Sequence, residues 1–237
     1  MKAFLLAAGH GTRLRPLTDN IPKCLLPVQG IPLLQIWLDL CHRFGIDQVL
    51  INVHAHADVV LGFLQKHTKG TRVHVVAEER LLGSAGTLLS NRQWVQSEDC
   101  FWVFYADVLN RVDLGAMLRM HHSRKLAATI GVCRVRDPAR CGVVDVSENG
   151  IVCDFVEKPS KPRSNLAFAG LLVGTPLLLD LIPRKQPADL GFDVFPELVG
   201  RMLAYEISEY LIDIGTVENY RKAQETWPGT QGSLGDL

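Results

Sequence analysis

The sequence carries no net charge, no long apolar run and no paired cysteines, and each absence excludes a class of protein. Its 25 lysines and arginines balance 25 acidic residues, so nothing in the composition favours nucleic acid or an anionic membrane as a partner. No apolar stretch approaches the roughly 18–20 residues that span a bilayer. The apolar run after Met1 breaks at Gly9, which makes it too short for a secretory signal. We therefore expect a cytoplasmic protein.

The six cysteines are scattered, with no C-x-x-C pair and no histidine at ligand spacing. In a cytoplasmic chain such cysteines are most simply reduced and act as small apolar side chains. The sequence also contains no internal repeat and no clear linker. What remains is a chain of 237 residues, 47% of them hydrophobic, which is enough for the core of one α/β domain.

Strand and helix patterns alternate through the first half of the chain. Apolar runs with the length of buried strands lie at 2–7, 48–53, 72–77, 101–106 and 127–133. Amphipathic stretches of helical length lie between them, at about 32–44, 56–67, 84–93 and 113–123. This alternation predicts a Rossmann-like α/β fold, in which helices cover both faces of a mostly parallel sheet.

The second half shows shorter strands and then returns to helical patterns. Three short strands are expected at 142–146, 151–157 and 166–173, with a hairpin turn at residues 148–150. Helical patterns follow near 175–182, 192–203 and 216–226. We expect residues 1–226 to form one domain and residues 227–237, which are rich in glycine, to form a flexible tail.

A glycine-rich segment follows the first apolar run and points to a phosphate site. Residues 9–13 read Gly-His-Gly-Thr-Arg, and glycine lets backbone N–H groups approach a polyphosphate closely because it has no Cβ. Arg13 and Lys23 add two cations beside this turn. Ligands of parallel sheets bind beyond the carboxyl ends of the strands, which is where this segment would lie.

Two common nucleotide-binding motifs fit this segment poorly. The dinucleotide pattern G-x-G-x-x-G needs a third glycine where Leu14 stands, and Arg15-Pro16 interrupts the helix that should follow. The lysine and serine or threonine pair of the P-loop is also absent.

Five segments together carry a more specific signal. They are LAAGHGTRLRPLT with PKCLLPVQGIP, residues 81–87 (LLGSAGT), residues 104–107 (FYAD), residues 157–159 (EKP) and residues 213–216 (DIGT). In order and spacing they resemble the sugar-1-phosphate nucleotidyltransferases, which join an NTP and a sugar 1-phosphate into an NDP-sugar and release pyrophosphate. Mannose-1-phosphate and heptose-1-phosphate guanylyltransferases are the members most similar in style. The resemblance implies the nucleotide-diphospho-sugar transferase type of fold, here without a C-terminal β-helix.

The resemblance also implies which residues bind and react. Arg13 would contact the β- and γ-phosphates, and Lys23 the attacking phosphate and the α-phosphoryl group. Asp107 and Asp213 would hold Mg²⁺, the implied cofactor. The remaining nucleotide-binding residues would be Leu6, Ala7, Ala8, Gly9, Gly11, Thr12, Glu78, Gly83 and Ser84. The sugar 1-phosphate would contact Gly142, Glu157, Lys158, Asn165 and Gly170.

Two positions bear on the choice of base and sugar. Glu78 stands five residues before Gly83, where the family commonly reads the base, and a carboxylate can accept from the adjacent N1–H and N2–H of guanine. This favours GTP, with Glu79 or backbone groups as other readers. Phe168 occupies the position of a usual asparagine, and Asn165 is the candidate to replace it.

Several alternatives stay open at this point. A uridylyl- or thymidylyltransferase acting on a glucose or amino-sugar 1-phosphate is the first, and a phosphocholine cytidylyltransferase shares the opening motif. A non-catalytic subunit that senses an NDP-sugar is an alternative of another class, although it would not need all four of Arg13, Lys23, Asp107 and Asp213. The expected partners are an NTP and a sugar 1-phosphate, and a homodimer is left open.

Overall fold

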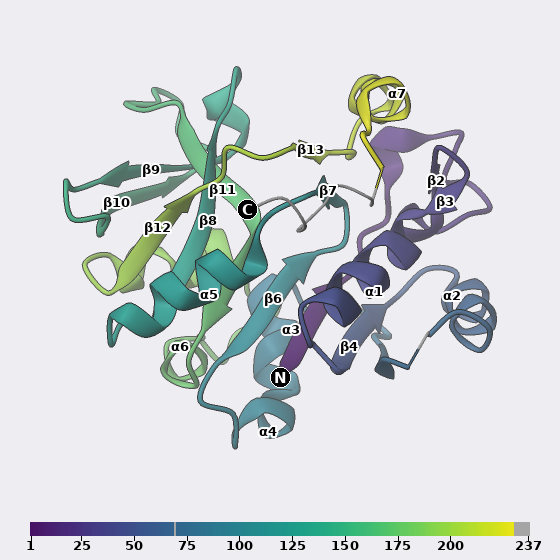
Figure 1. The fold of residues 1–237 in the computed structure, drawn as a ribbon, viewed down its shortest axis with the longest axis horizontal. Coiled ribbons are helices and arrows are strands. Elements are labelled where there is room, and N and C mark those ends of the chain that lie inside the picture. The colour runs from purple at the N-terminus through teal and green to yellow at the C-terminus, as the bar shows by residue number, and fades with distance from the viewer. Residues whose placement is uncertain (69, 230–237) are drawn as a thin grey trace, which may run out of the picture.

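The structure is built on one mixed β-sheet (Figure 1). The computed structural model describes residues 1–68 and 70–229. Across these residues the main sheet has nine strands in the order β10-β9-β11-β6-β1-β4-β5, with β8 paired to β11 and to β12. The strands are β1 (Lys2–Leu6), β4 (Gln48–Val53), β5 (Arg72–Ala77), β6 (Phe101–Tyr105), β8 (Ala128–Arg134), β9 (Gly142–Val146), β10 (Val152–Glu157), β11 (Leu166–Gly174) and β12 (Met202–Glu206).

Four neighbouring strands, β6, β1, β4 and β5, run parallel. The register places Leu6 beside both Asn52 and Tyr105, so the carboxyl ends of three strands meet at one edge. These strands are nearly continuous apolar runs because a parallel sheet is covered on both faces. Successive residues accordingly alternate between two hydrophobic cores: Leu5 packs into one and Phe4 into the other.

Helices cover both faces of the sheet, which confirms the predicted α/β architecture (Figure 1). One core receives side chains from α1 (Leu33–Arg43), α2 (Ala57–Leu64), α5 (Leu114–Ser123) and α7 (Val217–Thr226). The other receives side chains from α3 (Ser84–Ser90), α4 (Arg92–Val95) and α6 (Leu177–Asp180). In the part of the chain that the structure describes, no helix has the length and apolar character needed to cross a membrane.

The second half of the chain adds antiparallel strands to the sheet. Strand β11 runs antiparallel to β6, β8 and β9, and β9 and β10 form the predicted hairpin. Two small sheets were not expected from the sequence: β7 (Val108–Asn110) with β13 (Leu211–Asp213), and β2 (Pro27–Val28) with β3 (Ile31–Pro32). The first of these places Asp213 opposite Val108.

The prediction of a helix at 192–203 is wrong. The chain instead makes one turn of π-helix at Leu190–Val194, a 3₁₀ turn at Pro196–Leu198 and then strand β12. Pro196 cannot donate a helical hydrogen bond, and Gly200 has a φ of 79°, which ends any helix. Residues 202–206 then pair in parallel with β8. The helix expected at 84–93 is also interrupted, at Asn91, and becomes α3 and α4.

Trp227, which we expected to begin a flexible tail, packs against the domain. Its side chain is 4% exposed, and its ring centroid lies 5.2 Å from that of Tyr210. Gln29 Nε2 donates to the Trp227 carbonyl oxygen at 2.9 Å. These contacts extend the folded region past α7, while residues 230–237 of the expected tail lie outside the described residues.

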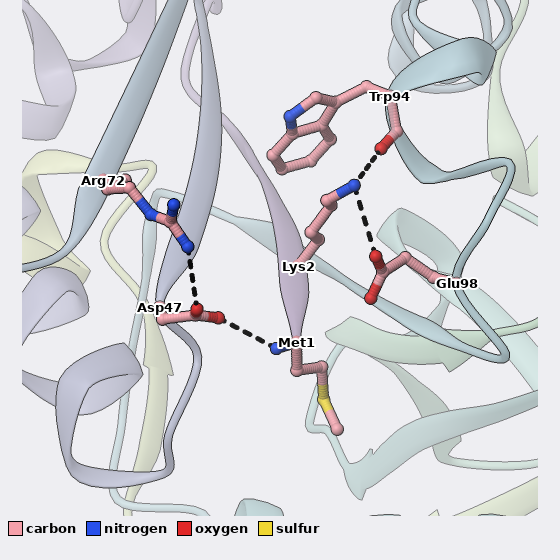
Figure 2. A network of polar contacts seen from close by, with 6 residues as sticks. All are labelled: Met1, Lys2, Asp47, Arg72, Trp94 and Glu98. Atoms are coloured by element: carbon pink, nitrogen blue, oxygen red, sulfur yellow. Dashed lines mark hydrogen bonds and ion pairs between the residues drawn. The ribbon is translucent and has the colours of Figure 1, made fainter.

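Charged contacts hold the opposite, N-terminal ends of the parallel strands (Figure 2). Asp47 accepts from the Met1 amino group at 2.9 Å and from Arg72 Nη2 at 3.2 Å. Lys2 Nζ donates to the Trp94 carbonyl oxygen at 2.7 Å. Because the carboxylate of Asp47 and the side chain of Arg72 are largely exposed, their ion pair adds little to stability, and its effect is to align the starts of β4 and β5.

We expect His121 to make the fold sensitive to mild acid. Its side chain is 4% exposed, its Nδ1 lies 3.1 Å from Thr129 Oγ1, and burial lowers its pKa from 6.5 to about 4. Between those two values the unfolded chain binds the proton more readily than the folded chain, so stability is lost as pH falls from 6.5 towards 4. At about 1.4 kcal/mol per pH unit, the loss is at most about 3 kcal/mol.

The substitution His121→Gln should therefore flatten the dependence of unfolding free energy on pH in this window, as measured by urea titration at several pH values. His122→Gln is the matched control, because His122 is exposed and acts on the pKa of His121 only through its charge. An equally steep loss of stability in wild type and in His121→Gln would contradict the assignment.

Candidate functional site

A cavity of about 460 Å³ opens at the carboxyl edge of the parallel strands. Its walls are the segment after β1, the charged residues Lys23 and Asp107, and the loop before α3. Every residue predicted to bind the nucleotide lines it, namely Leu6, Ala7, Ala8, Gly9, Gly11, Thr12, Arg13, Glu78, Gly83 and Ser84. The structure thus gathers segments that are up to 209 positions apart around one cavity, since Leu6 and Gly215 both line it.

Gly11 shapes the turn that follows β1. Its φ of 63° lies in the left-handed region, where glycine is favoured, and its carbonyl oxygen accepts from Thr18 Oγ1 at 2.8 Å. A Cβ at this position would lie 3.1 Å from Thr18 Cγ2 and 3.3 Å from Lys23 Cβ. The absence of a side chain therefore lets the segment carrying Lys23 pack directly on the glycine-rich turn.

Four charged side chains converge on Gly215. Lys23 Nζ lies 2.5 Å from Asp107 Oδ2. A Cβ placed on Gly215 would lie 2.7 Å from Asp213 Oδ1, 3.0 Å from Arg13 Nη2 and 3.1 Å from Lys23 Nζ. The pairing of β7 with β13 holds the two acidic segments together. The four residues that the sequence predicted to be catalytic are thus neighbours.

The electrostatics of this cluster suit a divalent cation. Burial raises the pKa of Asp213 and the charge of Asp107 raises it further, while Lys23 and Arg13 act in the opposite sense. Within residues 1–68 and 70–229, no group of three or more His, Cys, Asp and Glu side chains could hold a metal. Mg²⁺, however, often takes only one or two protein carboxylates and completes its shell with phosphate oxygens and water. The pair Asp107 and Asp213 fits that mode of binding.

Glu78 is a buried carboxylate at the wall of the cavity, and it is already hydrogen-bonded. It is 7% exposed. Its Oε1 accepts from Asn52 Nδ2 at 2.9 Å and from Thr87 Oγ1 at 2.5 Å, and its Oε2 accepts from Leu82 N at 3.2 Å. Each carboxylate oxygen can accept about two bonds, so the remaining capacity lies on Oε2. We expected both oxygens to accept from a base, and these three bonds were not foreseen from the sequence.

The predicted sugar-side residues lie beyond the carboxyl end of β6. Strand β11 continues past that end, where its Ala167 pairs with Val143 of β9. There the Glu157 carboxylate packs against Gly142, because a Cβ on Gly142 would lie only 2.6 Å from Glu157 Oε2. Burial raises the pKa of Glu157, and Lys158 Nζ lies 3.7 Å from its Oε1.

Gly170, the other predicted glycine of this region, allows a second close approach. It has a φ of 78°, and a Cβ there would lie 2.7 Å from Val108 Cγ2 and 3.3 Å from Tyr105 Cβ. Tyr105 lines the cavity. Gly170 therefore lets β11 lie directly against the end of β6 between the two sides of the site.

Asn165 lies apart from the other predicted sugar-side residues. Its Oδ1 accepts from Arg134 Nη1 at 3.2 Å, whereas Gly142 and Glu157 lie against each other. None of the five predicted sugar-side residues lines the nucleotide cavity. Phe168 instead packs between two aromatic rings, with centroid distances of 5.6 Å to Tyr105 and 5.0 Å to Phe195. The structure therefore does not place Asn165 at the position where the family has asparagine. Phe168 occupies that position and packs in an aromatic cluster.

Two residues of the site were missed by the sequence reasoning. Asn52 is 4% exposed, and its Oδ1 accepts from Ala7 N at 2.8 Å, which ties the phosphate segment to Glu78. An asparagine within the apolar run 48–53 was the available signal. Asp189 accepts from Ser84 Oγ at 2.8 Å across 105 positions of the chain, and no local pattern in the sequence indicates that contact.

Comparisons with known proteins identify similar chains. The family model described as "Nucleotidyl transferase" matches residues 2–228. The chain is 32% identical over 226 residues to mannose-1-phosphate guanylyltransferase catalytic subunit beta of Xenopus tropicalis. It is also 32% identical over 241 residues to UTP--glucose-1-phosphate uridylyltransferase of Synechocystis sp.. These alignments cover 93% and 94% of this chain but 62% of each relative, so the chain spans less than two thirds of their length.

A solved structure shows the same fold at lower identity. HddC from Yersinia pseudotuberculosis, crystallised in complex with GMP-PN, superposes with a TM-score of 0.80 at 23% sequence identity. The superposition covers 95% of this chain and 99% of that chain. The architecture described above is therefore that of an experimentally observed fold.

The bonds to Glu78 predict a measurable role for Thr87 in stability. Thr87→Val keeps the shape of the side chain but removes the donor to a buried carboxylate, and a hydrogen bond to a charged group contributes about 1.5–3 kcal/mol. We expect the free energy of unfolding in urea to fall by about 2 kcal/mol. Thr129→Val is the matched control, because its hydroxyl contacts the His121 ring and a bond between neutral groups contributes about 0.5–1.5 kcal/mol. Equal losses in the two variants would contradict the prediction.

Proposed function

The chain belongs to the nucleotidyl transferase family, and from this premise we propose that it transfers a nucleoside monophosphate from an NTP to a sugar 1-phosphate, with release of pyrophosphate. One observation carries the proposal: Arg13, Lys23, Asp107 and Asp213 converge on Gly215 beside a cavity walled by the glycine-rich segment. The products would be an NDP-sugar and pyrophosphate.

Charge neutralisation is the main requirement of this reaction, because one phosphate anion attacks another. The planar guanidinium of an arginine can bind two oxygens at once, so we assign Arg13 to the β- and γ-phosphates, where it opposes the charge that develops on departing pyrophosphate. Lys23 is assigned to the α-phosphoryl group and the attacking phosphate. No general base is needed, since the second pKa of a phosphate monoester is about 6 and the nucleophile is ionised near neutral pH.

Asp107 and Asp213 are the residues that would hold Mg²⁺. When bound, the ion supplies charge neutralisation and orientation at the phosphoryl oxygens. The protein's own part is to keep both carboxylates at one place through the pairing of β7 with β13. Lys23, which lies 2.5 Å from Asp107 Oδ2, limits the repulsion between the two acids.

Glu157 and Lys158 are assigned to the sugar 1-phosphate. Lys158 would bind the phosphate, and Glu157 would accept hydrogen bonds from sugar hydroxyls. Burial of the Glu157 carboxylate against Gly142 reduces its contact with water, so hydrogen-bond donors supplied by a ligand would be favourable there.

For the base we propose guanine, with Glu78 reading its Watson–Crick edge, and for the sugar a mannose or heptose 1-phosphate. Glu78 lines the cavity, and a mannose-1-phosphate guanylyltransferase is among the similar chains. A uracil or thymine nucleotide is the second candidate. The observation that favours it is the bonding of Glu78, whose remaining acceptor capacity on Oε2 suits the single N3–H donor of those bases.

The reaction is tested by measuring pyrophosphate release across ATP, CTP, GTP, UTP and dTTP, each with mannose, heptose and glucose 1-phosphates. We expect release with GTP that stops when Mg²⁺ is chelated. Release with UTP or dTTP instead would keep the reaction and replace the base. An absence of release throughout, with NDP-sugar still bound, would indicate a non-catalytic sensor.

Asp107→Asn should lower kcat at least about 100-fold, because the amide removes one of the two negative charges that attract the cation. Turnover is measured over a titration of Mg²⁺, and thermal unfolding checks the fold. Asp180→Asn is the matched control: Asp180 pairs with Arg92 at the surface at 2.9 Å, and its variant should retain wild-type turnover. Normal turnover of Asp107→Asn at the Mg²⁺ concentrations that support wild-type turnover would contradict the metal assignment.

Glu78→Gln should lower the ratio of kcat/KM for GTP to that for UTP about tenfold or more. The reason is that a neutral amide replaces the carboxylate, and a hydrogen bond to a charged group is stronger than one between neutral groups. The exposed neighbour in Glu79→Gln is the matched control. An unchanged ratio in Glu78→Gln, or an equal change in both variants, would remove Glu78 as the reader of the base.

A further inference from the structure

Residues 188–194 contact both the loop beside the nucleotide cavity and the predicted sugar-side residues. At the nucleotide side, the Ala188 carbonyl oxygen accepts from Gly86 N at 3.1 Å, and Asp189 Oδ2 accepts from Ser84 Oγ at 2.8 Å. At the sugar side, Gly191 lies against the carboxylate of Glu157, whose Cδ would be 2.9 Å from a Cβ on that glycine. One short segment therefore touches both the loop that walls the nucleotide cavity and the predicted sugar-binding acid.

Hydrogen bonds and an ion pair hold this segment in one conformation. Asp189 Oδ1 accepts from Gly191 N at 2.8 Å and from Phe192 N at 3.3 Å. Asp193 Oδ2 accepts from the backbone N of Asp189 at 2.8 Å, and its Oδ1 lies 2.6 Å from Lys185 Nζ. These bonds hold the backbone on both sides of Phe192.

Phe192 is the exposed apolar side chain of this segment. It is 58% exposed, and Lys158 Nζ lies 5.4 Å from the centroid of its ring. A cation over an aromatic face is attracted to it. Lys158 itself has a φ of 49°, an uncommon value for a residue with a side chain. The ammonium group therefore lies between the Phe192 ring and Glu157, whose Oε1 is 3.7 Å away.

We propose that Phe192 is a positioning residue for Lys158 and the apolar wall of the sugar 1-phosphate site, an inference that rests on the proposed function of that site. A sugar ring has polar hydroxyl edges and a face of C–H groups, and small-molecule sites commonly combine an aromatic wall with a few placed polar groups. Here Glu157 would take the hydroxyls, Lys158 the phosphate and Phe192 the C–H face. The ligand class is a sugar 1-phosphate with free ring hydroxyls.

The test compares Phe192→Ala and Phe192→Tyr with wild type in two measurements. The first is the KM for mannose 1-phosphate and for GTP in pyrophosphate release. The second is the Kd of mannose 1-phosphate by calorimetry. Leu177→Ala is the matched control, because Leu177 is a similarly exposed apolar side chain, 63% exposed, that lies in α6 and outside residues 188–194. Since Phe192 is exposed, its variants should keep the wild-type melting temperature.

Phe192→Ala should raise the KM and Kd of mannose 1-phosphate about threefold to tenfold with the KM for GTP unchanged, and Phe192→Tyr should restore wild-type values. In a Lys158→Ala background the effect of Phe192→Ala should shrink, because residues that act together are not additive. A merely structural role would move both KM values and the melting temperature together.

The outcomes separate this inference from the proposed function. Normal turnover in wild type with unchanged sugar-phosphate KM and Kd in Phe192→Ala would overturn the inference alone. Binding without turnover in wild type, weakened in Phe192→Ala, would support the inference and overturn the proposed reaction. Neither turnover nor binding with mannose or glucose 1-phosphate would overturn both.

Discussion

The ion pair between Lys23 and Asp107 joins the two segments on which the rest of the site depends. Lys23 lies on the long connection that leaves β1, and Asp107 follows β6, the strand paired with β1. Their side chains are 12% and 29% exposed, so neither charge is fully solvated and each needs the other. With Asp213 and Arg13 the cluster holds two cations and two anions around Gly215. The fold can therefore keep four charges together before any ligand is bound, and a polyphosphate and a divalent cation would meet groups of opposite sign already in place.

The second constraint is that the backbone must approach neighbouring groups closely at several points of the site, and glycine stands at each of them. A Cβ on Gly215 would crowd the side chains of Asp213 and Arg13. A Cβ on Gly142 would displace the Glu157 carboxylate. Gly83 in turn packs on the backbone of Ala188. The contact between Gly83 and Ala188 thus joins the nucleotide-side loop to segment 188–194 directly through the backbone. Segment 188–194 in turn contacts Glu157 on the sugar side through Gly191.

Sequence periodicity predicted the parallel strands well and failed where the pairing is remote. The runs at 48–53 and 72–77 are β4 and β5 as predicted, because a strand buried on both faces leaves a continuous apolar signal. The apolar spacing across 192–203 suggests a helix, yet Pro196 and Gly200 interrupt it and residues 202–206 pair with β8. That pairing depends on a strand about seventy positions earlier, at 128–134, and no local pattern expresses it.

The sequence by itself determined the fold class, through the alternation of strand and helix patterns, and the glycine-rich turn after β1, whose conformation follows from its own residues. The four charged residues that meet at Gly215 were indicated by short motifs that resemble those of the sugar-1-phosphate nucleotidyltransferases. Only the tertiary structure decided how those motifs are bonded to one another. It showed that three donors already occupy Glu78, that Asn165 pairs with Arg134 away from the cleft, and that Asp189 meets Ser84 across 105 positions. The physical reason is that backbone conformation is set by neighbouring residues, whereas the partner of a buried polar group is whichever side chain the packing of distant strands and helices places beside it.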